Sequence, residues 1–473
     1  MAHGQGLLPY RIETTERSEH VTARAGLRLV VETMHALGLD RAIEKHLRLR
    51  RRRSGYGECQ KVEAMVLLLA SGGDCLDDIR VLSADAGLCR LLDRKLPSPD
   101  TLLGFLYAFH DEGLITAAQE RRAPGTVAYI PEESAPLCGL ARVNSALVHA
   151  LAAQGGGCRA TLDHDATIQE SHKREALPHY KHGRGYQPAA IYWAEQDLVV
   201  ADEYRDGNVP AGMQNLPLIR RGFASLPPNV TELFFRADSA CYENAVLRWL
   251  ADPARQDGPR GTIGFTVSAD MSRELRAVCA ALPEPSWLLV EERANETVMC
   301  AEVEFTPSES WPKDAEPLRY VAVRFRPRQL TLEGTEDIKY LAVVTNRREL
   351  DAPALCRWHW QKAGTIEHLH HVTKNELAAR VPPCGRFGAN AAWYRFAMLT
   401  YNVLSAMKSL ALPPHFGDAR PKRIRFSLFS LAGRIVSHAG DLVLRIASQV
   451  EKLAGLIQAR ARLAALRPLL DAS

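Results

Sequence analysis

The chain has 473 residues, of which 46% are hydrophobic and 24% charged, and its formal net charge is +4. The length predicts about two to four globular domains, and the small net charge means that any contact with nucleic acid depends on local basic clusters. The ten cysteines form no C-x-x-C pair, which argues against a disulfide framework and a structural zinc site. The N-terminus lacks a long apolar core, and the most apolar long segment, 396–412, contains Asn402 and Lys408, so we expect a cytoplasmic protein without a membrane span.

Residues 1–155 are expected to form a helical N-terminal region. Apolar residues recur at helical spacing over 27–37, and further apolar helices are expected over 62–69 and after Ser98. Between the first two helices, positions 41–53 hold seven basic residues and one acid. Helices that flank a basic turn favour contact with DNA phosphates, and a solvated loop is the alternative. The centre of the basic run is Arg50, Arg51, Arg52 and Arg53.

From residue 156 onward, strand and helix patterns alternate. Strands are expected at 158–168, 186–194, 198–204, 231–238 and 262–267, and helices at 214–225 and 243–251. This order predicts an α/β arrangement around a mixed sheet.

The second half of the chain begins with a run of β-like segments. Alternating apolar segments over 270–350 predict a mainly β insertion, whose last strand returns to the main sheet. Helices are then expected over 351–380, 390–412 and 445–467. A basic patch that includes Lys422 and Arg423 precedes the last of these helices.

Two acids lie two positions apart in the segment T-L-D-H-D-A-T-I-Q-E, residues 161–170. In a strand, Asp163 and Asp165 point to the same side of the sheet, where two like charges repel each other. A divalent cation, a raised pKa or water would relieve this repulsion, and a solvated strand end is the alternative.

Two further acids lie in settings that suit chemistry. Asp238 follows a predicted strand, where side chains face the crevice at the strand ends, although an N-cap or a turn is equally compatible. Trp360, Glu367 and Lys374 are seven residues apart, so they would share one face of a continuous helix. An amphipathic helix with solvated charges is the alternative.

Several histidines surround these acids, but they do not form a recognised zinc motif. No H-E-x-x-H segment is present, and strand parity points His164 away from the two aspartates. A zinc hydrolase is therefore not favoured, although His368, His370 and His371 lie next to Glu367.

The motifs together resemble those of a DDE-type insertion-sequence transposase with a β insertion before the last acid. D-x-D-A-T, G-R-G-Y-Q-P, R-A-D-S, V-V-T-N and G-A-N-A-A-W follow one another in the order of that family. The run W-x2-A-x3-E-x6-K resembles the family signature Y-x2-R-x3-E-x6-K, with Trp360 and Ala363 in place of tyrosine and arginine. The resemblance covers about residues 25–450, and Lys362 is one step away from the missing arginine.

The resemblance implies an RNase H-like core interrupted by the insertion. The expected division is a helical DNA-binding region at 1–155, a first part of the catalytic core at 156–270, a mainly β insertion at 271–338, a second part of the core at 339–412 and a basic C-terminal region at 413–473.

The resemblance also implies the site. Asp165, Asp238 and Glu367 are the expected catalytic acids, with Asp163 as the second choice for the first of them, and they would hold two Mg²⁺ or Mn²⁺ ions. The residues expected to contact DNA are Lys374, Trp360, Lys362, Arg50, Arg51, Arg52, Arg53, Lys422 and Arg423. The insertion tryptophans Trp287 and Trp311 are expected to be core residues, although an aromatic of the insertion stacks on a flipped base in similar transposases.

The expected activity is cut-and-paste DNA transposition, in which the ends of an element are cut and joined to target DNA. The partners would be double-stranded DNA, as terminal inverted repeats and target, and a second copy of the chain, which would place the protein at the nucleoid. An inactive DNA-binding derivative and a metal-dependent nuclease without strand transfer are the alternatives.

Overall fold

A computed structural model describes residues 20–49, 55–155, 157–307, 311, 316–329, 338–446 and 450–471. The basic run Arg50, Arg51, Arg52 and Arg53 lies outside these described residues.

The N-terminal region is helical, as expected. Ser98 caps α6 by accepting a hydrogen bond from Thr101 N, and Gly72 ends α3 with a φ of 95°, which favours glycine. The short helices between and after the expected ones, and the long helix α8, were not predicted individually. The helices are α1 (Arg28–Ala36), α2 (Leu39–His46), α3 (Glu58–Ser71), α4 (Ile79–Ser83), α5 (Ala86–Leu91), α6 (Pro99–Tyr107), α7 (Glu112–Arg121) and α8 (Ala135–Ala152).

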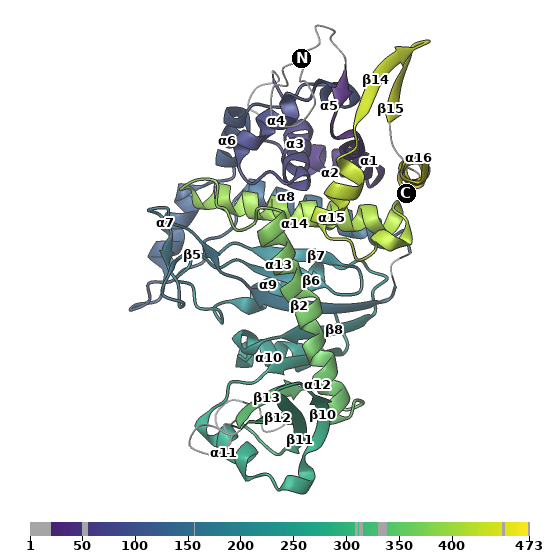
Figure 1. Cartoon of the computed structure of the whole chain (residues 1–473). Helices are drawn as coiled ribbons and strands as arrows, with labels where there is room; N and C mark the ends of the chain where they lie inside the picture. Colours follow the sequence, from purple (N-terminus) through teal and green to yellow (C-terminus); the bar gives the residue numbers. More distant parts are fainter. Residues whose placement is uncertain are drawn as a thin grey trace, which may run out of the picture.

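The predicted mixed sheet is present at the centre of the molecule (Figure 1). Its core strands are β2 (Arg159–Ala166), β6 (Ala189–Trp193), β7 (Leu198–Glu203), β8 (Glu232–Ala237) and β9 (Ile263–Ser268), in the order β9-β8-β2-β6-β7. β2 runs antiparallel to β6 and parallel to β8, and β9 runs parallel to β8. The helices α9 (Asn215–Ala224) and α10 (Asn244–Ala251) connect the last three of these strands along the chain. This arrangement confirms the RNase H-like α/β core.

The strands of the β insertion extend the same sheet. After α11 (Arg273–Ala281) come β10 (Leu288–Glu292), β11 (Glu296–Val303), β12 (Arg319–Pro327) and β13 (Lys339–Thr345). β13 pairs antiparallel with both β12 and β9, so the sheet has nine strands, in the order β10-β11-β12-β13-β9-β8-β2-β6-β7. Figure 1 shows these strands at the end of the molecule opposite the N-terminal helices.

The long helix α14 (Phe387–Leu410) lies between the sheet and the N-terminal helices (Figure 1). It contacts α3, α6, α8 and β7, and every residue from Gly388 to Met407 is buried. This burial accounts for the apolar composition of the segment 396–412. Among the described residues, no helix combines the length and the apolar character that crossing a membrane requires.

The remaining elements lie around this framework. A small sheet follows β2 in the segment where no strand was predicted, and the C-terminal hairpin pairs with the first strand of the chain. These elements are β1 (Val21–Thr22), β3 (Gln169–Glu170), β4 (Leu177–Pro178), β5 (Arg184–Tyr186), α15 (Pro421–Ile424), a π-helical turn at Arg425–Phe429, β14 (Gly433–His438), β15 (Asp441–Ile446) and α16 (Val450–Asp471).

The prediction of one helix over 351–380 was wrong. The segment forms α12 (Ala352–Trp360), a 3-10 turn at Gln361–Gly364 and α13 (Ile366–Glu376). The backbone leaves the helical conformation at Thr365, where φ is −114° and ψ is −92°, and Thr365 Oγ1 donates a hydrogen bond to Asp163. Trp360 and Glu367 therefore lie on two different helices, and the shared face inferred from their spacing does not exist. The last helix was also placed too early, because 441–446 forms β15.

Candidate active site

The two aspartates of β2 lie in different environments. Arg236 Nε donates to Asp163 Oδ1 at 2.6 Å and Arg236 Nη2 donates to Oδ2 at 2.9 Å. Both side chains are almost fully buried, and Thr365 Oγ1 also donates to Asp163 Oδ2. Asp163 is thus occupied by a bidentate ion pair, so the geometry favours Asp165 as the acid available for chemistry.

Asp165 lies near both of the other candidate acids. Burial and, after it, the negative charge of Asp238 raise the pKa of Asp165 to about 7, and Glu367 adds a smaller effect in the same direction. Lys362 opposes this shift. A raised pKa means that the surrounding protein does not neutralise the negative charge of this carboxyl group. Carboxyl groups of this kind are common at functional sites.

Asp238 follows β8 directly, as predicted. Its Oδ1 accepts a hydrogen bond from Ala240 N at 3.0 Å, which caps a short 3-10 turn, so the N-cap alternative describes part of its role. Burial raises the pKa of Asp238, Lys362 lowers it, and Asp270 raises it further.

Glu367 lies in the first turn of α13, and its side chain is 49% exposed. Lys362 Nζ lies 3.0 Å from Glu367 Oε1, so one ammonium group pairs with Glu367 and acts electrostatically on Asp165 and Asp238. The oxygens of the three acids do not all lie within 4.8 Å of one another. The electrostatic effects of Asp238, Glu367 and Lys362 on Asp165 nevertheless place the three acids in one neighbourhood, with Lys362 among them.

His370, on α13, lies next to Asp165. Its Nε2 lies 3.8 Å from Asp165 Oδ2, and burial lowers the pKa of His370 to about 3, so the ring is neutral. The other histidines point elsewhere: His164 Nδ1 lies 3.3 Å from Cys241 Sγ, and His371 Nε2 lies 3.4 Å from Arg420 Nη1. The prediction that His164 points away from the aspartates is confirmed.

Among the described residues, two other clusters have the spacing of metal ligands. One consists of His35, Cys59 and Glu63, and the other of Asp74, Cys75 and Asp78. In the first cluster, Glu63 already pairs with Arg94 and with His35. In the second, Asp78 Oδ2 accepts hydrogen bonds from the backbone N–H groups of Asp74 and Cys75, which is an ordinary turn.

The described residues expected to contact DNA lie in different surroundings. Lys422 and Arg423 are exposed, whereas the ring of Trp360 lies against Phe325 and Arg293 of the insertion. Lys362 points into the acidic site. Lys374, in the last turn of α13, donates from Nζ to Thr167 Oγ1 at 2.9 Å.

Lys374 also lines an open groove of about 770 Å³ beside the acids. Lys173, Lys181 and Arg380 lie in the same groove, with Glu170 as an acid among them. Burial lowers the pKa of Lys374, and the neighbouring Lys181 lowers it further. Four cations around one groove form a surface that attracts phosphate groups.

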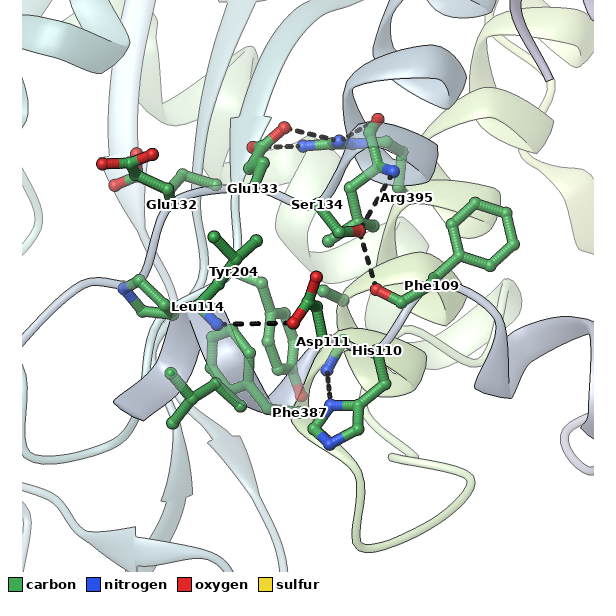
Figure 2. Close-up of a pocket in the computed structure, with 16 residues that line it drawn as sticks. Phe109, His110, Asp111, Leu114, Glu132, Glu133, Ser134, Tyr204, Phe387 and Arg395 are labelled. Carbon is green, nitrogen blue, oxygen red and sulfur yellow. Dashed lines mark hydrogen bonds and ion pairs between the residues drawn. The ribbon is translucent and has the colours of Figure 1, made fainter. Parts of the chain in front are cut away.

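A second pocket, shown in Figure 2, is a structural cavity. Its volume is about 20 Å³, roughly enough for one water molecule, and none of the three acids lines it. Glu133 and Arg395 pair beside it, with Arg395 Nη2 at 2.8 Å from Glu133 Oε1. Arg395 also pairs with Asp202, and Glu133 with Arg221, so this network ties α14 to β7, α9 and the start of α8.

The insertion tryptophans differ from each other. Trp287 is 5% exposed and its ring stacks on the Arg324 guanidinium at 4.4 Å, which confirms the expected core position. Trp311 is half-buried, donates from Nε1 to Glu316 O at 3.0 Å and lines an open groove.

Three functional contacts were not predicted. Arg236 neutralises Asp163, Thr365 donates to it, and Lys362 pairs with Glu367. A signal for the first contact is present in the sequence, because Arg236 lies two positions before Asp238 and therefore faces the same side of the sheet. The parallel pairing of β2 with β8 places Arg236 directly opposite Asp163.

Comparison with known proteins shows the family of this chain. The sequence profile of a family described as Transposase DDE domain group 1 matches residues 8–468. No curated protein matches the chain. Among solved structures, the chain is similar to the piggyBac transposase in a synaptic complex with hairpin DNA, with a TM-score of 0.43 and 10% identity over 85% of this chain and 77% of that one.

Proposed function

Because this chain belongs to the family of transposase DDE domains, it is a DNA transposase, an enzyme that cleaves and transfers DNA, and we propose that Asp165, Asp238 and Glu367 are its catalytic acids. The observation that carries this proposal is the raised pKa of Asp165, because its causes include the charges of both other acids. Residues far apart in the sequence thus act on one carboxyl group. Asp163, by contrast, is already paired with Arg236.

Domains of this family generally use divalent metal ions. We propose two Mg²⁺ or Mn²⁺ ions, held by the three acids, since carboxylate oxygens are the ligands that these hard cations prefer. The donor set fits, because added positive charge would relieve the repulsion that raises the pKa of Asp165. When bound, the ions would activate the attacking water or 3′-hydroxyl and stabilise the leaving oxygen during in-line displacement at phosphorus.

The side chains around the acids have positioning roles in this proposal. Arg236 and Thr365 fix Asp163 and thereby the end of β2 that carries Asp165. Lys362 supplies a positive charge next to the acids. Once divalent ions neutralise the acids, its ammonium group would pair with a DNA phosphate instead. Lys374, in the basic groove, would pair with a phosphate next to the scissile bond.

We propose cut-and-paste transposition, in which the ends of the element are cleaved and then joined to target DNA. The helical N-terminal region, including Arg50–Arg53, and the basic patch with Lys422 and Arg423 would bind the terminal inverted repeats. Joining two ends requires two active sites, so we propose a homodimer in the DNA complex.

The test uses a supercoiled donor plasmid that carries the DNA flanking the coding sequence. Wild-type protein with Mg²⁺ is expected to give end cleavage and joined products, whereas Asp165→Asn, Asp238→Asn and Glu367→Gln lose cleavage by about a thousandfold or more. The matched control is Asp77→Asn, an exposed acid of the N-terminal region that is expected to leave cleavage unchanged. Cleavage without joined products would indicate a nuclease, and full cleavage by the Asp165→Asn variant would exclude the proposed site.

A further inference from the structure

We propose that the exposed ring of Phe426 inserts into a base step of the element-end duplex, and that α13 holds this ring at a fixed distance from the catalytic acids. The inference rests on the proposed function, since it requires that the duplex reaches those acids. The segment involved, called the basic turn below, comprises residues 420–429.

Phe426 is the most exposed large hydrophobic side chain among the described residues, at 86%. Its neighbours Leu428 and Phe429 are buried, so the segment is packed into the fold while this one ring points into solvent. The ring lies in a π-helical turn, a conformation that is rare and often occurs at functional sites.

The basic turn is fixed to the N-terminal helices. Arg425 Nε donates to the carbonyl of Ala70 at 2.7 Å and Arg425 Nη2 donates to that of Leu69 at 3.2 Å, so its guanidinium caps the end of α3. Gly26 packs directly against the carbonyl of Leu428, where a Cβ atom would clash. The ring of Phe426 is therefore presented from a rigid support.

The same turn is attached to the helix that carries the last acid. Glu376, at the C-terminal end of α13, accepts a hydrogen bond from Lys422 N at 2.7 Å and pairs with Arg420 Nε at 3.2 Å. Its carbonyl also accepts a hydrogen bond from Arg425. Glu367 lies nine residues earlier on α13, which corresponds to about 14 Å along the helix axis.

Cations lie both on α13 and on the basic turn. Lys374 lies on α13 between Glu367 and Glu376, and it shares its groove with Lys173, Lys181 and Arg380. On the basic turn itself, Lys422 and Arg423 are exposed beside Phe426. Cations in this groove and on the basic turn, together with an exposed aromatic ring, match the chemistry of a duplex, which offers phosphates along its backbone and stacked bases inside.

The length of α13 gives the register. At about 3.4 Å per base pair, 14 Å of helix corresponds to roughly four base pairs. We therefore infer that Phe426 unstacks a step about four to six base pairs from the cleaved phosphate, and that phosphates reached by Lys422 and Arg423 flank this step.

The experiment measures binding in Ca²⁺ with the full-length Asp238→Asn protein. The probes are duplexes of the DNA flanking the coding sequence, with 2-aminopurine placed at successive positions. Its fluorescence is expected to rise where a step is unstacked, about four to six base pairs from the cut. Phe426→Ala is expected to abolish this rise and to weaken binding roughly tenfold, while Phe426→Tyr retains both.

Salt dependence separates the ring from its charged neighbours. Phe426→Ala is expected to leave the slope of log affinity against log salt unchanged, whereas Lys422→Ala and Arg423→Ala each reduce it by about one. Leu289→Ala, which removes another exposed apolar side chain, is the matched control and is expected to change nothing.

Two outcomes would overturn the inference. The first is unchanged affinity and fluorescence in Phe426→Ala. The second is a lower oligomeric mass of Phe426→Ala with unaltered DNA binding, which would assign the ring to a contact between copies of the chain. The binding experiment does not depend on cleavage. Residual cutting by the Asp238→Asn protein in Mg²⁺ would contradict the assignment of the catalytic acids, but it would not affect the result on Phe426.

Discussion

Lys362 Nζ lies 3.0 Å from Oε1 of Glu367, and the same ammonium group lowers the pKa of both Asp165 and Asp238. This lysine is a positive charge supplied by the chain at the place where we propose divalent cations to bind. A cation that enters the site must therefore compete with Lys362.

We predict that Lys362→Gln binds Mn²⁺ more tightly than the wild type in the absence of DNA. Breaking a partly exposed ion pair costs up to about 1 kcal/mol, so the Mn²⁺ concentration at half-saturation is expected to fall about threefold. Electron paramagnetic resonance of free Mn²⁺ measures this directly. Arg348→Gln, which removes an exposed cation paired with Glu316, is the control. Weaker binding by Lys362→Gln would mean that the ammonium group does not occupy the cation site.

A second prediction concerns the metal-free protein and pH. Burial and the charge of Asp238 raise the pKa of Asp165 in the folded protein to about 7, above its value near 4 in the unfolded chain. The stability that the protonated Asp165 carboxyl provides is therefore complete below pH 4, and it is lost as the pH rises through 7. Asp165→Asn removes this penalty and is expected to be more stable than the wild type at about pH 8, by roughly 3 kcal/mol, and equally stable at about pH 4. Urea unfolding in EDTA tests this, and equal stability at both pH values would contradict it.

Arg236 is predicted to be needed for folding, because its loss leaves the buried Asp163 carboxyl without its ion-pair partner. Arg236→Met is expected to destabilise the protein by about 3 to 5 kcal/mol. In the double variant Arg236→Met with Asp163→Leu, the unpaired charge is absent and much of the stability should return. Thermal unfolding of the two variants provides the comparison. A double variant as unstable as the single one would show that the pair acts through more than charge neutralisation.

Acid sensitivity is predicted to arise in part at Glu133. Burial alone raises the pKa of Glu133, but Arg395 and Arg221 outweigh burial and lower it to about 2. Since the folded pKa is depressed, the stabilisation is present above about pH 4.5 and is lost as pH falls towards 2, an effect of about 3 kcal/mol.

Glu133→Gln is therefore expected to be less stable at neutral pH and to lose less stability on acidification than the wild type. Urea unfolding at several pH values measures both effects. Glu132→Gln, the neighbouring exposed acid, serves as the control. Parallel pH profiles of wild type and Glu133→Gln would exclude this ion pair as the source of acid sensitivity.

Much of the core could be predicted because its signals are local. The alternating residues around Asp163 and Asp165 define β2, and Ser98 with Pro99 defines the start of α6. The five core strands follow from their own apolar patterns, since strands buried on both faces are continuous apolar segments. The position of Asp238 follows from the end of such a strand.

The features that were not predicted depend on contacts distant in the sequence. The backbone break between α12 and α13 lies at Thr365, whose hydroxyl donates to Asp163, 202 positions away in the sequence. The strands β3, β4 and β5 have two or three residues each, too few for a periodic pattern. Whether Asp163 or Asp165 is free depends on a partner from β8, which the pattern of β2 alone does not contain.

The nine-stranded sheet has a mechanical consequence. β13 shares hydrogen bonds with the insertion on one edge and with β9 on the other, and β9 pairs with the strand that ends at Asp238. A ligand that twisted the insertion would exert a force through this continuous ladder on Asp238, which follows the strand two places along the sheet from β13. The orientation of the insertion and the position of Asp238 are therefore mechanically linked.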